Sequence, residues 1–339
     1  MLQKLRQSGT LLGFFLILLF FALKLPDTFL TARNLINISQ QLSMLAVVAA
    51  TMTIVMVMND FDLSVGSMAS LSGIVAAMLF TAGYPVWVGL SVALLVGVFG
   101  GLFNGFLVSV VGILPFVATL GTLTVFSGMA FLLSDGKTVF GRDTPASFSG
   151  FARAGIEIGN IKIPMLTITA GLVIFICWCI LEHTNFGRRL YAIGGNKEAS
   201  HLAGIKVVRL RLYAFSLTGL GAAGAGLMYA ARVASANPTQ GSGLMLDAIA
   251  AVFLGMTMSR RGEPKVIYTL VGVLILGVLD NGMTQLSVDS YVREILVGLI
   301  VLAALLVATV SKDALVLLGG LAVAYGFQMW PALIAICWW

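Results

Sequence analysis

The hydrophobic residues of this chain form long continuous runs, and short polar segments separate them. Runs of roughly 17–25 apolar residues have the length of a helical membrane span, whereas the strands of a membrane barrel alternate over about ten residues. Because lipid offers no hydrogen-bond partners, a spanning backbone must form helices or a closed barrel. The pattern therefore predicts an all-α, polytopic membrane protein with about ten transmembrane helices. The expected spans are residues 10–25, 42–58, 64–82, 86–110, 116–133, 164–181, 212–231, 244–258, 266–286 and 294–310.

The two ends of the chain carry further apolar runs. The first span has no small-residue cleavage site after it, so we interpret it as uncleaved, with Lys4 and Arg6 held on the cytoplasmic side. Near the other end, residues 314–335 are again apolar and predict either an eleventh span or an appendage; both interpretations stay open. We accordingly expect one membrane domain over residues 1–313 and an atypical apolar tail over residues 314–339.

Composition supports the membrane class and excludes several others. Hydrophobic residues make up 59% of the 339 positions and charged residues 10%, against about 25% charged in ordinary soluble domains. The net charge of +6 is divided among several loops, so we expect the lipid bilayer as a partner and no nucleic acid. The three cysteines lie in apolar stretches without nearby histidines, which predicts neither a disulfide framework nor a metal site.

One polar segment, residues 182–211, is unusually basic and lies between two apolar spans. It holds six of the twenty Lys and Arg residues. A basic loop between spans is cytoplasmic by the positive-inside rule. Six crossings from a cytoplasmic N-terminus bring this loop to the inner side, and two more bring the basic turn at residues 259–265 to the same side.

This basic loop also contains the signature of a short helix. Asn196 is suited to cap its start, Glu198 lies in the first turn where the helix dipole favours a carboxylate, and Gly204 is suited to a left-handed ending. Ala199 and Leu202 fall on one small apolar face. The pattern predicts a helix that docks on a soluble partner, and the alternative of a merely solvated anchoring loop stays open.

Motifs of soluble enzymes are absent or out of context. The residues Gly219-Leu-Gly221-Ala-Ala-Gly224 match G-x-G-x-x-G, but they lie inside an apolar helix with no preceding strand, so we interpret them as a packing surface. The sequence has no P-loop and no H-E-x-x-H motif, and both histidines fall in the basic loop. We therefore expect no catalytic site, no cofactor and no metal.

A few ionisable residues fall near membrane depth, where such residues are functional candidates by default. All of them except Asp60 also have a structural interpretation: Asp62 as the cap of the span at 64–82, Arg232 and Asp247 as a pair across one outer loop, and Asp280-Asn281-Gly282 as a break or turn in the span at 266–286. The candidates are Asp60, Asp62, Arg232, Asp247 and Asp280.

Uncharged hydrogen-bonding side chains in or beside the spans are a second set of candidates. A path for a sugar or polyol needs donors and acceptors without fixed charge, although each such side chain is also suited to a helix–helix hydrogen bond. Together with one carboxylate they form the predicted substrate pathway. Its members are Asp62, Ser64, Asn104, Thr119, Thr122 and Asn281.

Four stretches of the chain, in this order, resemble a known family. They are Asp62-Leu-Ser-Val-Gly66, Ala118-Thr-Leu-Gly-Thr122, Gly187-Arg-Arg-Leu-Tyr-Ala-Ile-Gly-Gly-Asn-Lys-Glu-Ala-Ser200, and Leu246-Asp-Ala-Ile-Ala-Ala-Val-Phe-Leu-Gly255. With them, the chain resembles the permease subunits of bacterial ATP-binding cassette sugar importers, the ribose, xylose, arabinose and galactoside group. The resemblance extends over about residues 34–310, and the tail at 314–339 lies outside it.

The resemblance implies a helical permease of the bacterial inner membrane that imports a sugar or polyol and has its N-terminus in the cytoplasm. It also implies two cytoplasmic ATP-binding cassette ATPase subunits, a periplasmic sugar-binding protein and a second permease copy, identical or paralogous. Residues 190–204 then correspond to the segment that couples to the ATPase. The alternative is a stand-alone secondary transporter of a small polar solute, which calls for coupling-ion carboxylates and inverted repeats.

Overall fold

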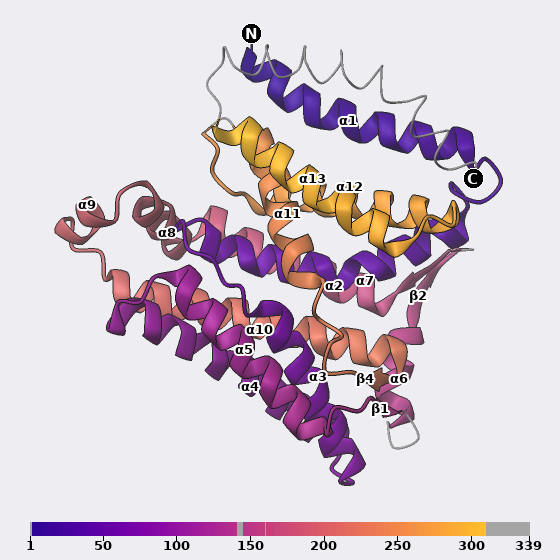
Figure 1. Cartoon of the computed structure of the whole chain (residues 1–339), viewed down its shortest axis with the longest axis horizontal. Helices are drawn as coiled ribbons and strands as arrows, with labels where there is room; N and C mark the ends of the chain where they lie inside the picture. The colour runs from indigo at the N-terminus through magenta and orange to yellow at the C-terminus, as the bar shows by residue number, and fades with distance from the viewer. Residues whose placement is uncertain (1, 141–144, 160, 260, 310–339) are drawn as a thin grey trace.

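The computed structural model describes residues 2–140, 145–159, 161–259 and 261–309, and most of them are helical (Figure 1). Single π-helical turns, η1 at Leu107–Val111 and η2 at Cys179–His183, prolong the fourth and seventh helices. Three helices are short: α6 (Ala146–Arg153), α8 (Asn185–Gly195) and α9 (Lys197–Leu202). The long helices are α1 (Leu2–Lys24), α2 (Ala32–Met56), α3 (Val65–Thr81), α4 (Val86–Phe106), α5 (Pro115–Ser134), α7 (Met165–Trp178), α10 (Val207–Val233), α11 (Leu244–Met258), α12 (Val266–Gln285) and α13 (Ser290–Thr309).

Each of the ten predicted spans overlaps one of these long helices. Within the described residues, six segments are long and apolar enough to cross a membrane: α2, α4 with η1, α5, α7 with η2, α10 and α12. The apolar helices at Thr10–Lys24, Val65–Thr81 and Leu244–Met258 are shorter. The mostly helical, multi-pass class is therefore confirmed, whereas the number of about ten spans is not. The predicted tail at 314–339 lies outside the described residues.

Two short antiparallel strand pairs depart from the predicted all-α class. Strand β1 (Val139–Phe140) pairs with β4 (Ser235–Ala236), and β2 (Gly155–Ile158) pairs with β3 (Ile161–Pro164). They lie with α6 at one end of the helices, and α8 and α9 lie at the opposite end (Figure 1). The sequence gives little signal for strands this short, because their length is below that of an ordinary strand.

The end that carries α8 and α9, called here the α8–α9 end, also gathers the second basic turn and the start of the first apolar helix. The Tyr191 hydroxyl donates to the Pro264 carbonyl at 3.0 Å, and Lys265 lies 3.7 Å from the Glu182 carboxylate. The Thr10 hydroxyl lies 2.8 Å from that of Thr257. The two basic loops therefore share one end of the bundle, as the crossing pattern requires.

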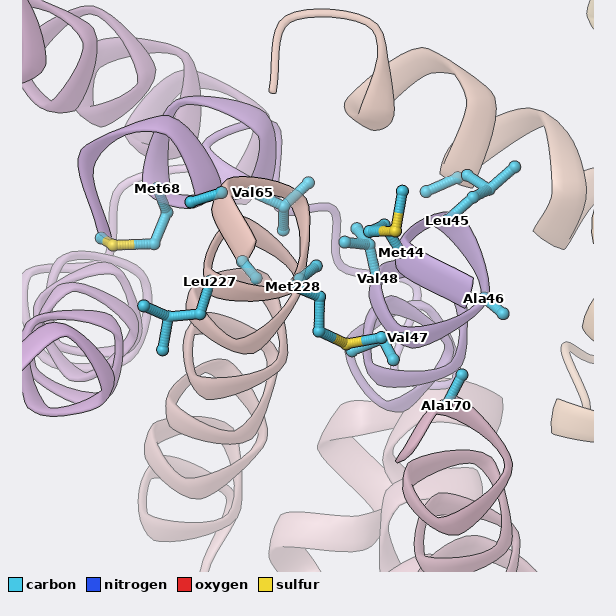
Figure 2. Packing of buried hydrophobic residues seen from close by; sticks show 14 of the residues in the cluster. Met44, Leu45, Ala46, Val47, Val48, Val65, Met68, Ala170, Leu227 and Met228 are labelled. Carbon is cyan, nitrogen blue, oxygen red and sulfur yellow. The ribbon is translucent and has the colours of Figure 1, made fainter. Parts of the chain in front are cut away.

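Helix α10 lies at the centre and packs against α2, α3 and α4. In Figure 2, Leu227 and Met228 point to different sides of α10, and the Met228 side chain reaches toward Val47 of α2. Against α4 the contact is between backbones: a Cβ built on Gly219 would lie 2.2 Å from the Gly97 carbonyl oxygen. The G-x-G-x-x-G stretch is thus a packing surface inside a helix, as its apolar context predicts.

The predicted break at Asp280-Asn281-Gly282 is wrong. Helix α12 continues through these residues to Gln285. The glycine instead leaves room for an aromatic ring, because a Cβ on Gly282 would lie 2.5 Å from the Phe21 ring. Close packing of α1 on α12, rather than a turn, accounts for the small residue.

Two glycines on α10 provide a matched test of this packing. Gly219→Ala places a methyl group against the α4 backbone, and overpacking of this kind costs about 1–3 kcal/mol. Gly224→Ala enters open space and should be neutral or stabilising by about 0.5–1 kcal/mol, because alanine is the better helix former. Thermal unfolding of both variants in lipid nanodiscs measures the difference, and equal melting temperatures would contradict the close approach.

Candidate functional site

The residues between α2 and α3, 57–64, form a buried loop that we call the α2–α3 loop. Asn59 adopts φ +60°, a left-handed conformation that asparagine tolerates better than most residues, and it reverses the chain after α2. Asp60 and Asp62 follow, and both are almost fully buried at 2% and 1% exposure. Buried carboxylates need partners, so their surroundings define the site.

Asp62 is held by a compact hydrogen-bond cluster at the start of α3. Its Oδ1 accepts from the Ser64 backbone N–H at 3.0 Å and from the Ser64 hydroxyl at 2.6 Å. Asn104 of α4 donates to the Ser64 hydroxyl oxygen at 2.8 Å and to Asp62 at 3.3 Å. Burial raises the pKa of Asp62, and the hydrogen bonds from Ser64 and Asn104 oppose that rise. The cap position itself is occupied by Ser64, with Asp62 two residues before it.

Thr119 and Thr122 of α5 complete the neighbourhood. The Thr119 hydroxyl donates to the Pro115 carbonyl at 2.7 Å and lies 3.4 Å from the Phe61 carbonyl of the α2–α3 loop. Thr122, one turn further along, donates to the Thr119 carbonyl at 3.2 Å. The structure therefore gathers Asp62, Ser64, Asn104 and these threonines along α3, α4 and α5, with the donors engaged inside the protein.

Asn281 lies apart from that group. Its side chain exchanges hydrogen bonds with Asn34 of α2, at 2.9 and 3.1 Å, and accepts from Gln285 at 2.8 Å. Thr28 donates to Gln285 at 2.7 Å, so this amide pair joins α2 and α12 near the connection between α1 and α2. The structure does not bring Asn281 to the other predicted pathway residues.

A buried ion pair was missed from the sequence. The Arg211 guanidinium of α10 lies 2.5 Å from Asp60 Oδ1, and both side chains are buried. Burial raises the pKa of Asp60 to about 6, although Arg211 opposes the rise. In the sequence, Arg211 is the last residue of the basic segment 182–211. The signal that could have found it is its place on α10, where the neighbouring Leu210 and Ala214 are also buried.

The α2–α3 loop also contacts α8 directly. Asn59 donates to the Gly194 carbonyl at 2.7 Å, and a Cβ on Gly194 would lie 2.0 Å from the Val57 carbonyl oxygen. Helix α8, which the sequence pattern does not predict, is capped by Thr184, whose hydroxyl accepts from the Gly187 N–H at 3.2 Å. The backbone of α8 thus rests on the same loop that carries Asp60 and Asp62.

Helix α9 has the local structure that the sequence predicts. The Asn196 side chain accepts from the Ala199 N–H at 2.9 Å, Glu198 lies in the first turn, and Gly204 adopts φ +80° after the end. Its apolar face is open, since Leu202 is 87% exposed. A cavity of about 520 Å³ lies beside it, lined among others by Lys197, Glu198, His201 and Val208.

A second cavity, of about 150 Å³, lies between α3, α5 and residues 238–245. We call it the hydroxyl pocket, because its polar lining consists of serine and threonine side chains and no charged side chain is among the described residues that line it. Sequence reasoning missed these hydroxyls, since a hydroxyl in a helix usually bonds to its own backbone. They are Ser67, Ser70, Ser127, Thr239 and Ser242.

The remaining ionisable candidates lie toward the end opposite α9. Arg232, Asp247 and Asp280 line one cavity of about 460 Å³. The predicted pair between Arg232 and Asp247 is not formed in the described part of the chain. Asp280 pairs instead with Arg293 of α13.

The structure thus defines a helical bundle with several candidate membrane spans, an uncharged, hydroxyl-lined pocket and an exposed helix at one end. The comparisons identify the family. The chain belongs to the family described as "Branched-chain amino acid transport system / permease component", whose model matches residues 34–305. The family is that of a membrane permease component and not of an enzyme, so the expectations of a permease and of no catalysis by this chain are confirmed.

Curated relatives match over most of their length. The chain is 38% identical over 301 residues to the ribose import permease protein RbsC of Bacillus subtilis (strain 168), covering 89% of this chain and 92% of that protein. It is 35% identical over 300 residues to the L-arabinose transport system permease protein AraH of Escherichia coli (strain K12), covering 88% and 89%. The D-allose transport system permease protein AlsC of the same strain is 33% identical over 309 residues, covering 91% of each.

A solved structure supports the fold. It is described as an inward-facing conformation of a metal-chelate type ABC transporter, and it aligns with a TM-score of 0.52 over 90% of this chain and 100% of that chain. The sequence identity is 17%, so the likeness concerns the fold alone.

The buried ion pair gives a testable prediction about stability. Asp60→Asn leaves the Arg211 charge buried without its partner, which should destabilise the protein by roughly 3–5 kcal/mol. The double variant Asp60→Asn with Arg211→Met should recover much of that loss, because no buried charge remains. Thermal unfolding of the single and double variants measures the coupling.

The exposed pair between Asp135 and Lys137, 2.6 Å apart, is the matched control. Asp135→Asn should change the melting temperature little, because exposed pairs contribute little to stability. A double variant as unstable as the sum of its single variants would show that Asp60 and Arg211 do not act as a pair.

Proposed function

We propose that this chain is the membrane permease subunit of an ATP-binding cassette importer that carries a sugar or polyol across a bacterial inner membrane. The observation that carries the proposal is α9, a capped and solvent-exposed helix with Leu202 87% exposed at the end where both basic loops lie. The named relatives are permeases for ribose, arabinose and allose, which supports a sugar as the solute class.

The orientation follows from the basic loops. The positive-inside rule supports a cytoplasmic position for the α8–α9 end, and the contact between Thr10 and Thr257 supports the same side for the start of the first apolar helix. The membrane domain extends over residues 1–313. A cytoplasmic ATPase subunit docks on α9, a second permease copy completes the membrane unit, and a periplasmic sugar-binding protein delivers solute at the opposite end.

Coupling passes from α9 into the bundle through the α2–α3 loop. A displacement of α8 acts on this loop through the Asn59–Gly194 hydrogen bond, and the ion pair between Asp60 and Arg211 ties the same loop to α10. The next residues of the loop form the Asp62 cluster, which fixes the start of α3 against Asn104 of α4. Movement at the cytoplasmic end is thereby transmitted to the helices that line the hydroxyl pocket.

The solute path follows α3 and α5. Hydroxyl groups without fixed charge bind a neutral polyol reversibly, because each donates and accepts hydrogen bonds. We assign the hydroxyl pocket to the path, with its polar continuation toward the cytoplasm formed by Asp62, Ser64, Asn104, Thr119 and Thr122. We leave Asn281 out of the path, because its amide is engaged by Asn34 and Gln285.

The docking role of α9 is tested by two charge reversals, one on α9 itself and one at the opposite end of the helical bundle. Glu198→Lys places a positive charge on the docking surface and removes the carboxylate favoured in the first turn. We expect the variant to insert normally, to lose co-purification with the ATPase subunit and to lower ATP-dependent sugar uptake at least tenfold. Glu157→Lys, the same change at an exposed position on β2 at the opposite end of the bundle, is the control and should keep co-purification with the ATPase subunit.

A second variant tests α9 without changing any charge. Gly204→Pro is incompatible with φ +80° and should distort the end of α9 with the same loss of coupling. Full ATP-dependent uptake by both variants would exclude α9 as the coupling element. Uptake that persists without any ATPase subunit would instead favour the secondary transporter.

The role of the hydroxyl pocket in the solute path is tested by a substitution in its lining. Ser127→Leu replaces a hydroxyl of the pocket by a larger apolar side chain, so sugar uptake should fall at least tenfold while ATPase co-purification is unchanged. Thr81→Leu, a similar change at an exposed position on α3, is the control. Equal uptake by Ser127→Leu and the wild type would remove the hydroxyl pocket from the path.

A further inference from the structure

The cavity of about 460 Å³ toward the end opposite α9 is separate from the hydroxyl pocket. It lies among α2, α10, α11, α12 and α13, and we call it the outer cavity. Residues 238–245 form the wall between the two spaces. Gln240 and Gly243 line the outer cavity, whereas their neighbours Thr239 and Ser242 line the hydroxyl pocket.

Three polar side chains of the outer cavity have no direct partner among the described residues, although the charge of Arg293 also acts on one of them, Asp247. Tyr229 and Arg232 lie one turn apart on α10, and Asp247 lies in the first turn of α11. All three line the cavity and are partly buried, and within the described part of the chain none of their side chains makes a hydrogen bond or ion pair. A guanidinium only donates, a carboxylate only accepts and a phenol does both. Their polar atoms are therefore available to a solute that enters the cavity.

On the opposite wall of the cavity, the charged side chains are already paired. Gln41 and Arg293 both donate to the Asp280 carboxylate. Together with Arg232 and Asp247, the lining therefore carries two positive and two negative side chains. An ion of either sign would upset this balance, so the cavity favours a ligand without net charge. Apolar side chains, including Leu42, Leu276 and Leu279, complete the lining.

We propose that the outer cavity is a binding site for a small neutral polyhydroxylated solute, of the monosaccharide or polyol class, distinct from the hydroxyl pocket. Hydroxyl groups donate to Asp247, accept from Arg232 and do either with Tyr229, while the carbon skeleton lies on the leucines. The volume is in the range of ligand pockets, roughly 300–1,000 Å³. An amino acid zwitterion fits less well, because its ammonium group needs several acceptors and the cavity offers one free carboxylate.

The test measures binding to the full chain alone. The chain is reconstituted in nanodiscs without sugar-based detergent, and equilibrium binding is measured with radiolabelled D-ribose, ribitol and L-leucine. We expect saturable binding of D-ribose or ribitol and none of L-leucine. Asp247→Asn and Arg232→Gln should each weaken binding at least tenfold. Asp135→Asn and Arg153→Gln are the matched controls outside both cavities and should bind within twofold of the wild type.

Thermal unfolding of each variant shows whether it is folded. Absence of saturable polyol binding to the folded wild-type chain would overturn the proposal, as would binding that neither cavity variant weakens. Stronger binding of L-leucine would overturn the ligand class. Binding lost in Ser127→Leu but kept in Asp247→Asn would place the solute in the hydroxyl pocket instead. Because no ATPase subunit is present, these results stand whether or not the chain proves to be an importer subunit.

Discussion

The buried polar groups of the α2–α3 loop need hydrogen-bond partners inside the protein, and this requirement joins the loop to its neighbours. Four elements contribute: the α8 backbone through Asn59, α10 through Arg211, α4 through Asn104 and α5 through Thr119. The elements that carry the docking surface and the pocket therefore converge on eight residues, 57–64. The two buried carboxylates hold α10 and α4, whereas the Asn59 side chain holds α8 and the Phe61 carbonyl holds α5, so one loop links all four elements.

The sequence was sufficient for features that depend on neighbouring residues. Hydrophobic run length located the helices, and capping chemistry located α9, with Asn196 and Gly204 adopting the expected geometry. Both signals are local, since a span or a cap is determined within one or a few turns. Charge patterning also identified the two basic loops that share one end of the bundle.

Features that depend on distant partners were beyond the sequence. Asp60 and Arg211 are 151 residues apart, and no periodicity relates them. The predicted break at Gly282 is wrong for the same reason. A glycine that makes room for the Phe21 ring cannot be distinguished, from its neighbours in the sequence, from a glycine in a turn. The hydroxyl pocket was missed for a similar reason: its serines are ordinary helix residues until α3, α5 and residues 238–245 are packed together.

The contact between α4 and α10 has a mechanical consequence. Side chains that interdigitate can change rotamer and let two helices slide, but Gly97 and Gly219 place backbone against backbone, with no rotamers to exchange. If the helices slid along each other, backbone carbonyl oxygens of one helix would clash with backbone atoms of the other, and no side-chain rotation could relieve the clash. We therefore expect α4 and α10 to move together as one rigid unit during transport, while the other helices bend or rotate around them.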